Sequence, residues 1–261
     1  MYQSYIDACG KDGQKIERLI RSFYSAQSRR SVFIDGGAHT GYHSLYAAHR
    51  FDTRVVGIEA SPNIYINLIK KLRETPQRGG CEVQLVNSAL GCRARQGDTA
   101  QFFYSPTHPG RSTVNTKMWE QWGKGAVEYN APILAPIIEI DDLRALYTNG
   151  KPVDFIKLDL EGAEINALRG GVRTLMSDRP NIVMEFGLKP TNEQLFGETL
   201  AGFREMLSDW GYRAYAPWGE EVTESMLEGY PFWYLFLLPD DAEHWHNVSL
   251  LDAAFQKSVL E

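Results

Sequence analysis

The sequence passes from a strand pattern to a helix pattern within one stretch, Val32-Phe33-Ile34-Asp35-Gly36-Gly37-Ala38-His39-Thr40-Gly41. Its apolar start predicts a buried strand, and a helix pattern begins at about Tyr42. Glycine lets the backbone approach a ligand closely, and the start of a helix offers unpaired N–H groups. The stretch lacks the Gly-x-Gly-x-x-Gly fingerprint, and a carboxylate ahead of the glycines would repel a pyrophosphate. An NAD-dependent dehydrogenase is therefore a weak alternative.

Short β-branched runs alternate with helix-patterned segments along the rest of the chain. The strand-like runs are residues 31–35, 54–59, 82–87, 153–160, 181–186, 212–216 and 232–238. The helix patterns are residues 15–26, 42–50, 63–75, 164–169 continuing to 175, and 195–210. This alternation predicts an α/β fold with a mostly parallel sheet and helices on both faces. Since no long helix pattern separates the last two runs, we expect the sheet to end with an antiparallel strand.

One region, residues 91–149, interrupts this alternation and is interpreted as an insertion. Residues 1–30 are expected to form a helical extension, and residues 31–261 a single domain. Within it, residues 91–130 carry five Lys or Arg against three Asp or Glu and are rich in aromatic residues, which favours a lid over a bound substrate. Arg111 is the candidate phosphate-binding residue, and the candidate stacking surfaces are Tyr104, Trp119 and Trp122. The alternative is a surface excursion with ordinary aromatic packing.

Composition excludes several classes of protein. The 261 residues carry a net charge of −6, which argues against broad, charge-driven binding to nucleic acid. The longest apolar run, residues 232–238, is too short to cross a membrane. Three cysteines without metal-ligand spacing, behind an N-terminus unlike a signal peptide, predict a cytoplasmic protein. His244 and His246, in the tail after the last run, are expected on the surface.

A second carboxylate, Glu59, ends the next strand-like run, 24 residues after Asp35. An acid at the tip of a neighbouring strand is suited to a ribose diol, and the polar group Asn87-Ser88-Ala89 after the third run is suited to an adenine edge. This order of groups describes a site for an adenosine that carries a cation and no phosphates, which S-adenosylmethionine fits. The candidate cofactor-binding residues are Asp35, Gly36, Gly37, Ala38, His39, Thr40, Gly41, Glu59, Ala60, Ser61, Asn87, Ser88, Ala89 and Asp159.

The fourth run reads Asp154-Phe155-Ile156-Lys157-Leu158-Asp159-Leu160-Glu161-Gly162 and alternates in character. Side chains of a strand point alternately to its two faces, so Lys157, Asp159 and Glu161 should share one face. Burying these charges on a central strand is costly unless they open into a ligand crevice. The alternative is an antiparallel or edge strand with a solvated face.

Several of these stretches together closely resemble the FkbM family of S-adenosylmethionine-dependent methyltransferases. They are residues 35–41, 59–62, 87–91 and 156–164, with weaker likeness at 138–143, 181–186 and 232–239. The most specific element is Lys157-x-Asp159-x-Glu161-Gly162. The resemblance implies a class I methyltransferase (Rossmann-like) fold with seven strands, and O-methylation of sugars or natural products. The family commonly has Asn where this sequence has His39, which leaves the role of that position open.

The expected reaction is transfer of a methyl group to a hydroxyl oxygen of a small molecule. The first choice of acceptor is a sugar, including a nucleotide-linked one, and the second is a macrolide or other secondary metabolite. The candidate catalytic residues are Asp159, Glu161 and His39, and the candidate substrate-binding residues are Arg111, Tyr104, Lys157 and Glu185. A metal-free site is favoured because Lys157 supplies a positive charge. The alternatives are a divalent metal on Asp159, Glu161 and Glu185, or a catalytically silent binding subunit of the same shape.

Overall fold

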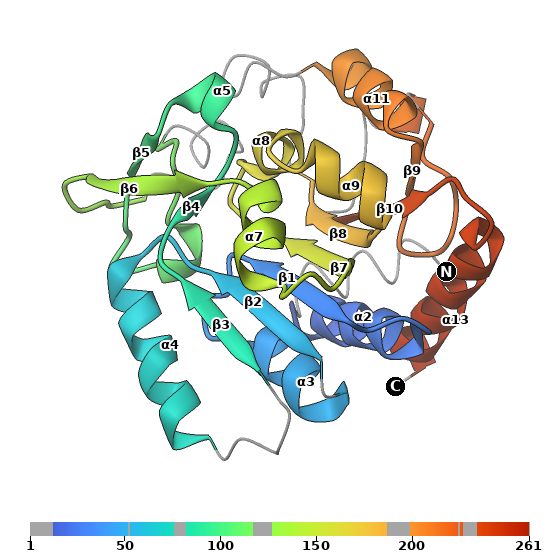
Figure 1. Ribbon diagram of the computed structural model, residues 1–261, viewed down its shortest axis with the longest axis horizontal. Coiled ribbons are helices and arrows are strands. Elements are labelled where there is room, and N and C mark those ends of the chain that lie inside the picture. Colours follow the sequence, from blue (N-terminus) through green and yellow to red (C-terminus); the bar gives the residue numbers. More distant parts are fainter. Residues whose placement is uncertain are drawn as a thin grey trace.

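The computed structural model describes residues 13–51, 53–75, 82–116, 127–186, 199–223, 225–226 and 234–260. Its main element is a seven-stranded sheet of order β3-β2-β1-β7-β8-β10-β9 (Figure 1). The strands are β1 (Val32–Gly36), β2 (Arg54–Ile58), β3 (Val83–Val86), β7 (Val153–Leu158), β8 (Asn181–Glu185), β9 (Tyr212–Tyr215) and β10 (Tyr234–Pro239). The seven strand-like runs predicted from the sequence correspond to these strands, and the α/β prediction is confirmed.

Strand direction follows the prediction with one refinement. The pairs β1–β2, β2–β3, β1–β7 and β7–β8 are parallel, whereas β10 is antiparallel to both β8 and β9. The last strand of the chain is thus antiparallel as expected, but it lies between β8 and β9 while β9 forms the edge. β7 is central and buried along its length, so the alternative of a solvated edge strand is wrong.

Helices cover both faces of the sheet. Figure 1 shows α7 (Ile140–Tyr147), α8 (Glu164–Arg169) and α9 (Val172–Asp178) in front, and α2 (Gly13–Ala26) and α3 (Tyr42–Phe51) behind. Two further helices of the described residues are α4 (Pro62–Glu74) and α11 (Leu200–Asp209). The segment expected to continue to residue 175 is divided into α8 and α9 at Gly170 and Gly171. A Cβ on Gly170 would lie 2.1 Å from the carbonyl oxygen of Gly91, so this packing needs glycine.

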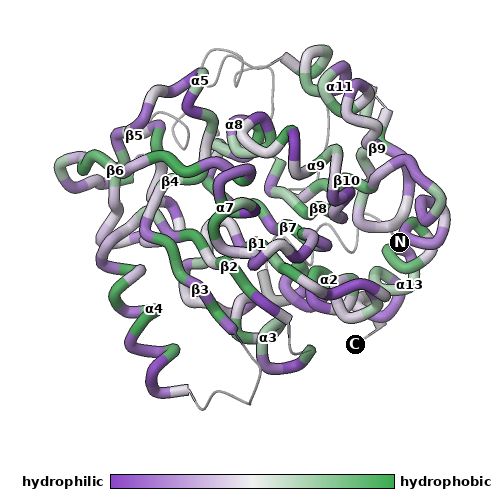
Figure 2. The backbone as a smooth tube through the Cα atoms, viewed as in Figure 1, coloured by the Kyte–Doolittle hydropathy of each residue, from purple (hydrophilic) through white to green (hydrophobic). Residues whose placement is uncertain are grey.

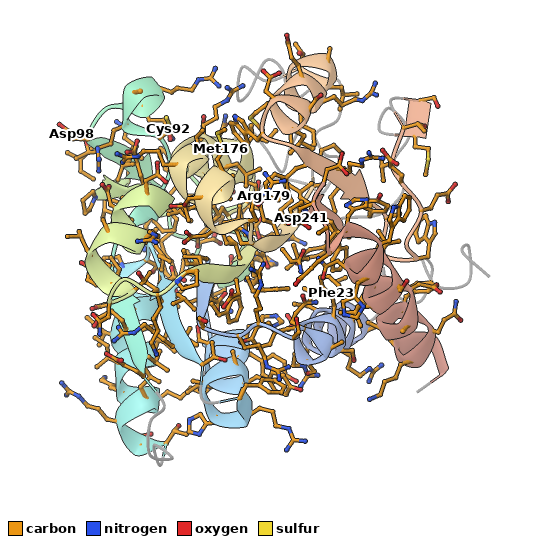
Figure 3. All side chains as sticks on the ribbon, turned by 45° about the vertical axis from the view of Figure 1, so that its right-hand side comes forward. Phe23, Cys92, Asp98, Met176, Arg179 and Asp241 are labelled. Carbon is orange, nitrogen blue, oxygen red and sulfur yellow. The ribbon has the colours of Figure 1, made fainter. Side chains whose placement is uncertain are left out.

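The two terminal helices pack against each other and against the sheet. The C-terminal helix, α13 (His244–Leu260), was not expected from the sequence, although Leu251, Ala254 and Phe255 form an apolar stripe. Phe23 of α2 is labelled in Figure 3. Its ring packs against Phe155 of β7 and Phe236 of β10, with ring centroids 5.9 and 5.3 Å apart. α2 packs its Phe23 on the sheet, and α13 contacts both α2 and β10, so the two helices together close the core beneath the sheet.

The expectation of a surface position is wrong for His244. Its side chain is buried, its Nε2 lies 2.7 Å from the Tyr215 hydroxyl, and its Nδ1 lies 2.9 Å from the carbonyl oxygen of Pro239. The reason is that His244 begins α13, whose first turn packs on β9 and β10. His246, two residues later, is exposed as expected.

A small second sheet lies beside the first and belongs largely to the insertion. It contains β4 (Ala89–Leu90), β6 (Ile133–Ile138) and β5 (Thr99–Phe102) in that order, with α5 (Arg93–Gln96) and the 3₁₀ turn η1 (Pro109–Arg111) nearby. Ala89, Phe102, Ala135 and Ile137 form its apolar core. Trp119 and Trp122, predicted as stacking surfaces, lie outside the described residues.

Hydropathy follows these layers. Figure 2 shows β2 coloured hydrophobic over most of its length, whereas α4 alternates between hydrophobic and hydrophilic residues. This is the pattern of a buried strand and a half-exposed helix. Among the helices of the described part of the chain, none has the length and apolar character needed to span a membrane. Cys92 is a buried free thiol, and the other two cysteines lie outside the described residues.

Candidate active site

A pocket opens at the carboxyl ends of β1, β2 and β7, where open α/β sheets bind ligands. Its lining includes these residues from the main sheet and its helices: Glu17, Gly37, Ala38, His39, Thr40, Tyr42, His43, Ile58, Glu59, Ala60, Lys157, Asp159, Leu160 and Glu161. The small sheet and the insertion contribute Ser88, Ala89, Leu90, Phe102, Pro109, Gly110, Ser112 and Val114. The structure thus brings most of the predicted cofactor and catalytic residues to one pocket. Five predicted cofactor residues are not among its lining residues: Asp35, Gly36, Gly41, Ser61 and Asn87.

The glycine loop is held by the neighbouring strands. The amides of Gly37 and Ala38 both donate to the carbonyl oxygen of Ile58, at 3.0 and 2.9 Å. Gly37 has φ of 74°, and a Cβ there would lie 2.0 Å from the carbonyl oxygen of Asp159. Glycine is required at this position because the loop touches the end of β7. The two amides are engaged within the protein, so they do not form an open anion cradle.

Asp35 lies beneath the loop rather than on the pocket surface. Its side chain is 1% exposed, and its Oδ2 accepts a hydrogen bond of 2.6 Å from the Ser44 hydroxyl. Its Oδ1 lies 3.5 Å from Nζ of Lys157. The strand register explains this pair, because Asp35 of β1 is directly opposite Lys157 of β7. Asp35 therefore acts on the pocket through Lys157.

Lys157 connects the loop with the end of β7. Its Nζ donates to the carbonyl oxygen of Gly37 at 3.1 Å and lies 3.5 Å from Oδ2 of Asp159. Burial alone would lower the pKa of Lys157, but the carboxylates of Asp159 and Asp35 outweigh burial and raise this pKa. The ammonium group is thus charged and surrounded by acceptors.

Glu59, at the end of β2, is buried and faces the pocket. Its two oxygens accept backbone hydrogen bonds from His39, at 3.0 Å, and from Ser61, at 2.8 Å. Burial raises the pKa of Glu59, and these hydrogen bonds act against that rise. A carboxylate oxygen can accept more than one hydrogen bond, so Glu59 retains capacity for ligand hydroxyls.

The polar residues after β3 divide between support and lining. The side-chain amide of Asn87 donates to the carbonyl oxygens of Glu59 and Ala60, at 2.7 and 3.3 Å. Asn87 therefore fixes the turn after β2. Ser88 and Ala89, the next two residues, line the pocket beside Phe102 of the small sheet.

After Leu158 the chain leaves the strand and turns. Glu161 has φ of 54° and Gly162 has φ of 99°. We expected Glu161 to continue the alternation of β7, but this turn interrupts the alternation before it. One oxygen of Glu164 accepts from the amides of Leu160, at 2.7 Å, and Gly162, at 3.3 Å. Glu164 thereby fixes the turn that presents Glu161 to the pocket, and burial raises the pKa of Glu164 to about 7. The sequence motif contained Glu164, but alternation alone gave it no role.

Three carboxylates meet at the ends of β7 and β8. Asp159, Glu161 and Glu185 each offer one oxygen, and these oxygens all lie within 4.8 Å of one another. Burial raises the pKa of Glu161 and of Glu185 well above the ordinary range, and the neighbouring carboxylates raise both further. The sequence predicted these three residues as the ligands of the alternative metal site, with Asp159 and Glu161 on a regular strand and Glu185 at the end of the next one.

Tyr234 is a site residue that sequence reasoning missed. It starts β10 directly opposite Glu185 of β8, and its hydroxyl donates to Oδ2 of Asp159 at 3.1 Å. Burial raises the pKa of Tyr234 well above its ordinary value, so the phenol stays protonated and donates to Asp159. The only sequence signal was a tyrosine in an apolar run, which gives no hint of this contact.

A second missed group comes from the N-terminal helix. Glu17 of α2 and His43 of α3 both line the pocket, with Oε2 of Glu17 2.5 Å from Nε2 of His43. Burial raises the pKa of Glu17, but the contact with His43 and the charge of Lys157 outweigh burial and lower this pKa. His39, on the loop above, has its pKa lowered by partial removal from water, which favours the neutral imidazole.

The substrate candidates of the insertion lie around the pocket rather than in its lining. Tyr104 packs against the core of the small sheet, and Arg111 lies in η1 between the lining residues Gly110 and Ser112. The Arg111 charge lowers the pKa of Glu161, although burial and two carboxylates outweigh it. Thr113 donates to the carbonyl oxygen of Glu161 at 3.1 Å, which joins the insertion to the β7–α8 turn.

The strand order, with one antiparallel strand next to the edge and a glycine loop after β1, is that of the class I methyltransferase fold. The family model for the methyltransferase FkbM domain matches residues 35–214. The chain therefore belongs to the FkbM family of S-adenosylmethionine-dependent methyltransferases, as the sequence motifs indicated.

Individual proteins that are similar to this chain share less than 30% sequence identity with it. Methyltransferase sdnD of Sordaria araneosa is 28% identical over 190 residues, which cover 62% of this chain and 70% of that protein. The crystal structure of methyltransferase FkbM from Methylobacillus flagellatus KT is 17% identical, with a TM-score of 0.47 over 80% of this chain. The match spans 43% of that chain, less than half its length. Magnesium protoporphyrin IX methyltransferase from Synechocystis PCC 6803, with bound S-adenosylmethionine, is 12% identical, with a TM-score of 0.41 over 91% of this chain and 79% of that one.

Proposed function

We propose that this protein transfers a methyl group from S-adenosylmethionine to a hydroxyl oxygen of a sugar. The observation that carries the proposal is one pocket in which Glu59 and the glycine loop lie beside Asp159, Glu161 and His39. The first set of groups suits a cationic adenosine, and the second suits a hydroxyl that must lose its proton. Family membership supports the cofactor, whereas the acceptor rests on the resemblance of the motifs.

The strand order supports one orientation of the cofactor. β2 and β3 lie on one side of β1, so Glu59 would bind the ribose and Ser88 and Ala89 would face the adenine. β7 lies on the other side of β1, where Lys157 and Asp159 line the pocket together with Glu17 of α2. The methionine end of the cofactor would lie on that side. Glu17, which is ionised at neutral pH, is suited to the α-ammonium group of the methionine.

The reaction itself is a displacement at carbon. The acceptor oxygen attacks the methyl carbon in line with the S–CH₃ bond, the C–S electron pair returns to sulfur, and S-adenosylhomocysteine leaves. The acceptor proton passes to a base of the protein and from there to water. The protein must therefore align the oxygen and hold a base within hydrogen-bond reach of it.

Three groups are candidates for that base: His39, Asp159 and Glu161. Asp159 accepts a hydrogen bond of 3.1 Å from the Tyr234 hydroxyl, and its Oδ2 lies 3.5 Å from Nζ of Lys157. Glu161 holds its proton more tightly because its pKa is raised. The lowered pKa of His39 leaves a neutral imidazole at pH 7, which makes it the best suited of the three.

The acceptor would enter between the β7–α8 turn and the insertion. Pro109, Gly110 and Ser112 line that side of the pocket. Arg111 lies between the last two in the chain and is the candidate residue for binding an acidic group of the acceptor. Tyr104, Lys157 and Glu185 remain candidates for acceptor binding. A macrolide or other secondary metabolite is the alternative acceptor. A cytoplasmic location also remains a prediction.

The experiment is methyl transfer from S-[methyl-³H]adenosylmethionine to a panel of nucleotide sugars, free sugars and macrolides. The proposal expects label in a sugar and release of one S-adenosylhomocysteine per transfer, with transfer lost in His39→Ala. Label in the macrolides alone would support the alternative acceptor. Binding of the cofactor without transfer to any hydroxylated compound would support the silent subunit.

A further inference from the structure

The three carboxylates at the ends of β7 and β8 form a second kind of site, to which the pocket-lining residues Asp159 and Glu161 contribute. We infer that Asp159, Glu161 and Glu185 bind one divalent cation of the Mg²⁺ or Mn²⁺ type. Two oxygens bound to one such ion at about 2.1–2.4 Å lie at most about 4.2–4.8 Å apart. The three carboxylate oxygens are already within 4.8 Å of one another, so small side-chain movements are enough to enclose an ion.

Among the described residues, only one carboxylate of this group has a balancing cation within 4.0 Å. Lys157 was expected to supply it, but its ammonium contacts Gly37, Asp35 and Asp159. In the described part of the chain, neither Glu161 nor Glu185 forms an ion pair within 4.0 Å with a Lys or Arg. The metal-free interpretation assumed that the positive charge of Lys157 balances the carboxylates, and this assumption holds for Asp159 alone.

Buried oxygens without partners are the second and independent observation. Oε2 of Glu161 and Oε2 of Glu185 are shielded from solvent and accept no hydrogen bond from the described residues. By contrast, Glu164 accepts two backbone hydrogen bonds. Leaving a buried carboxylate oxygen without a partner is costly, so these two atoms are placed for a ligand that the chain does not supply.

The donor set selects the type of ion. All three ligands are carboxylate oxygens, without nitrogen or sulfur, and such sets suit Mg²⁺, Mn²⁺ and Ca²⁺. Three protein ligands leave coordination positions for water or for an acceptor hydroxyl. The inference that the ion binds does not depend on which reaction the protein catalyses. Its role in lowering the pKa of the acceptor hydroxyl, so that His39 can take the proton, rests on the proposed function.

The test is a titration of the whole, EDTA-treated protein with MnCl₂ alone. Binding is measured as the loss of the free Mn²⁺ signal in electron paramagnetic resonance. We expect one Mn²⁺ per chain, and a dissociation constant raised at least tenfold in Glu161→Gln and in Glu185→Gln. Glu74→Gln, an exposed glutamate on α4, is the matched control and should bind as the wild type does. Circular dichroism of each variant verifies that it is folded.

Absence of stoichiometric Mn²⁺ binding by the wild type would overturn the inference. Equal binding by the folded Glu185→Gln and Glu161→Gln variants would overturn it as well, because the ion would then bind elsewhere. Binding of S-adenosylhomocysteine is measured on the same metal-free protein. If that ligand binds and Mn²⁺ does not, the metal site falls while the proposed function stands.

Discussion

The two sides of the pocket treat their carboxylates differently. On the β1–β2 side, Asp35 and Glu59 accept hydrogen bonds from Ser44, His39 and Ser61. On the β7–β8 side, Glu161 and Glu185 each have a buried oxygen without a partner among the described residues. Both oxygens of Glu59 are bonded within the chain, and the unbonded Oδ1 of Asp35 lies 3.5 Å from the Lys157 ammonium. Within the part of the chain that the structure describes, no Lys or Arg lies within 4.0 Å of Glu161 or Glu185, so their unbonded oxygens lack such a partner.

This difference separates the carboxylates that stabilise the structure of the site from those that have an oxygen available for a ligand. The carboxylates of the β1–β2 side hold the glycine loop and Lys157, so their removal should damage the protein itself. The carboxylates of the β7–β8 side cost stability when they are ionised together, so their neutralisation should leave the metal-free fold intact or improve it. Lys157 stands between the two sides, and its loss should affect both.

The largest effect is expected from Lys157→Met. The substitution leaves Asp35 and Asp159 without their shared cation in a buried place. Breaking a buried ion pair in this way costs about 3–5 kcal/mol. Urea denaturation at pH 7 should show a loss of this size in the free energy of unfolding.

The control for this substitution is Lys71→Met. The Lys71 ammonium donates to the carbonyl oxygen of Thr40 at 2.7 Å but is exposed. Loss of an exposed contact of this kind should cost less than about 1 kcal/mol. Similar losses in both variants would contradict the central position of Lys157.

The second effect concerns cofactor binding through Glu59. Glu59→Ala removes the acceptor for the ribose hydroxyls and frees the amides of His39 and Ser61. Loss of charge-assisted hydrogen bonds should weaken binding of S-adenosylhomocysteine by about 1.5–3 kcal/mol in calorimetry. Glu74→Ala should leave the affinity unchanged, and an unchanged affinity in Glu59→Ala would remove the ribose assignment.

The sequence predicted the β1–β2 side better than the β7–β8 side, for a physical reason. A strand, a glycine turn and a helix follow each other in the chain, so Gly37 and Glu59 were found from local patterns. The β7–β8 side depends on contacts between distant segments. Tyr234 reaches Asp159 only because β10 pairs antiparallel with β8, and Glu17 reaches the pocket only because α2 packs under the sheet. His244 was misplaced because α13 was not recognised as a helix.

Glu161 shows a different limit. Strict alternation placed it on the face of β7, but the chain turns with left-handed φ at this residue, a conformation that few side chains adopt. The two amides bonded to Glu164 stabilise the turn. Periodicity carries no information on such a turn, which brings a Glu161 oxygen within 4.8 Å of oxygens of Asp159 and Glu185.

The third effect is the pH dependence of stability in EDTA-treated protein. A carboxyl with a raised pKa in the folded state keeps its proton there, so its stabilising contribution is present at low pH and lost as pH rises. The pKa of about 7 for Glu164 places this loss near neutrality, and the raised pKa values of Glu161 and Glu185 act in the same direction. The melting temperature should therefore fall between pH 5 and about 8.

Glu185→Gln sharpens this test because it removes one titrating group from the β7–β8 side. We expect its melting temperature to fall less than that of the wild type over the same range, by about 2–4 °C for each kcal/mol of repulsion removed. Differential scanning calorimetry measures the difference. Parallel curves for the two proteins would mean that the three carboxylates do not repel each other.

The smallest effect is expected at Glu17. Glu17→Gln should weaken binding of S-adenosylhomocysteine, which has an α-ammonium group, by about 1 kcal/mol. Binding of 5′-methylthioadenosine, which lacks the amino acid end, should stay the same. An equal change for the two ligands would place Glu17 outside the methionine end of the pocket.

The central claim is that the pocket at the ends of β1, β2 and β7 binds S-adenosylmethionine as the methyl donor. The most direct measurement is calorimetric titration of the wild-type protein with S-adenosylhomocysteine, repeated in the presence of S-adenosylmethionine or of NAD. The account predicts one site per chain that S-adenosylmethionine blocks and NAD does not. Absence of binding, or competition by NAD at micromolar concentration, would contradict it.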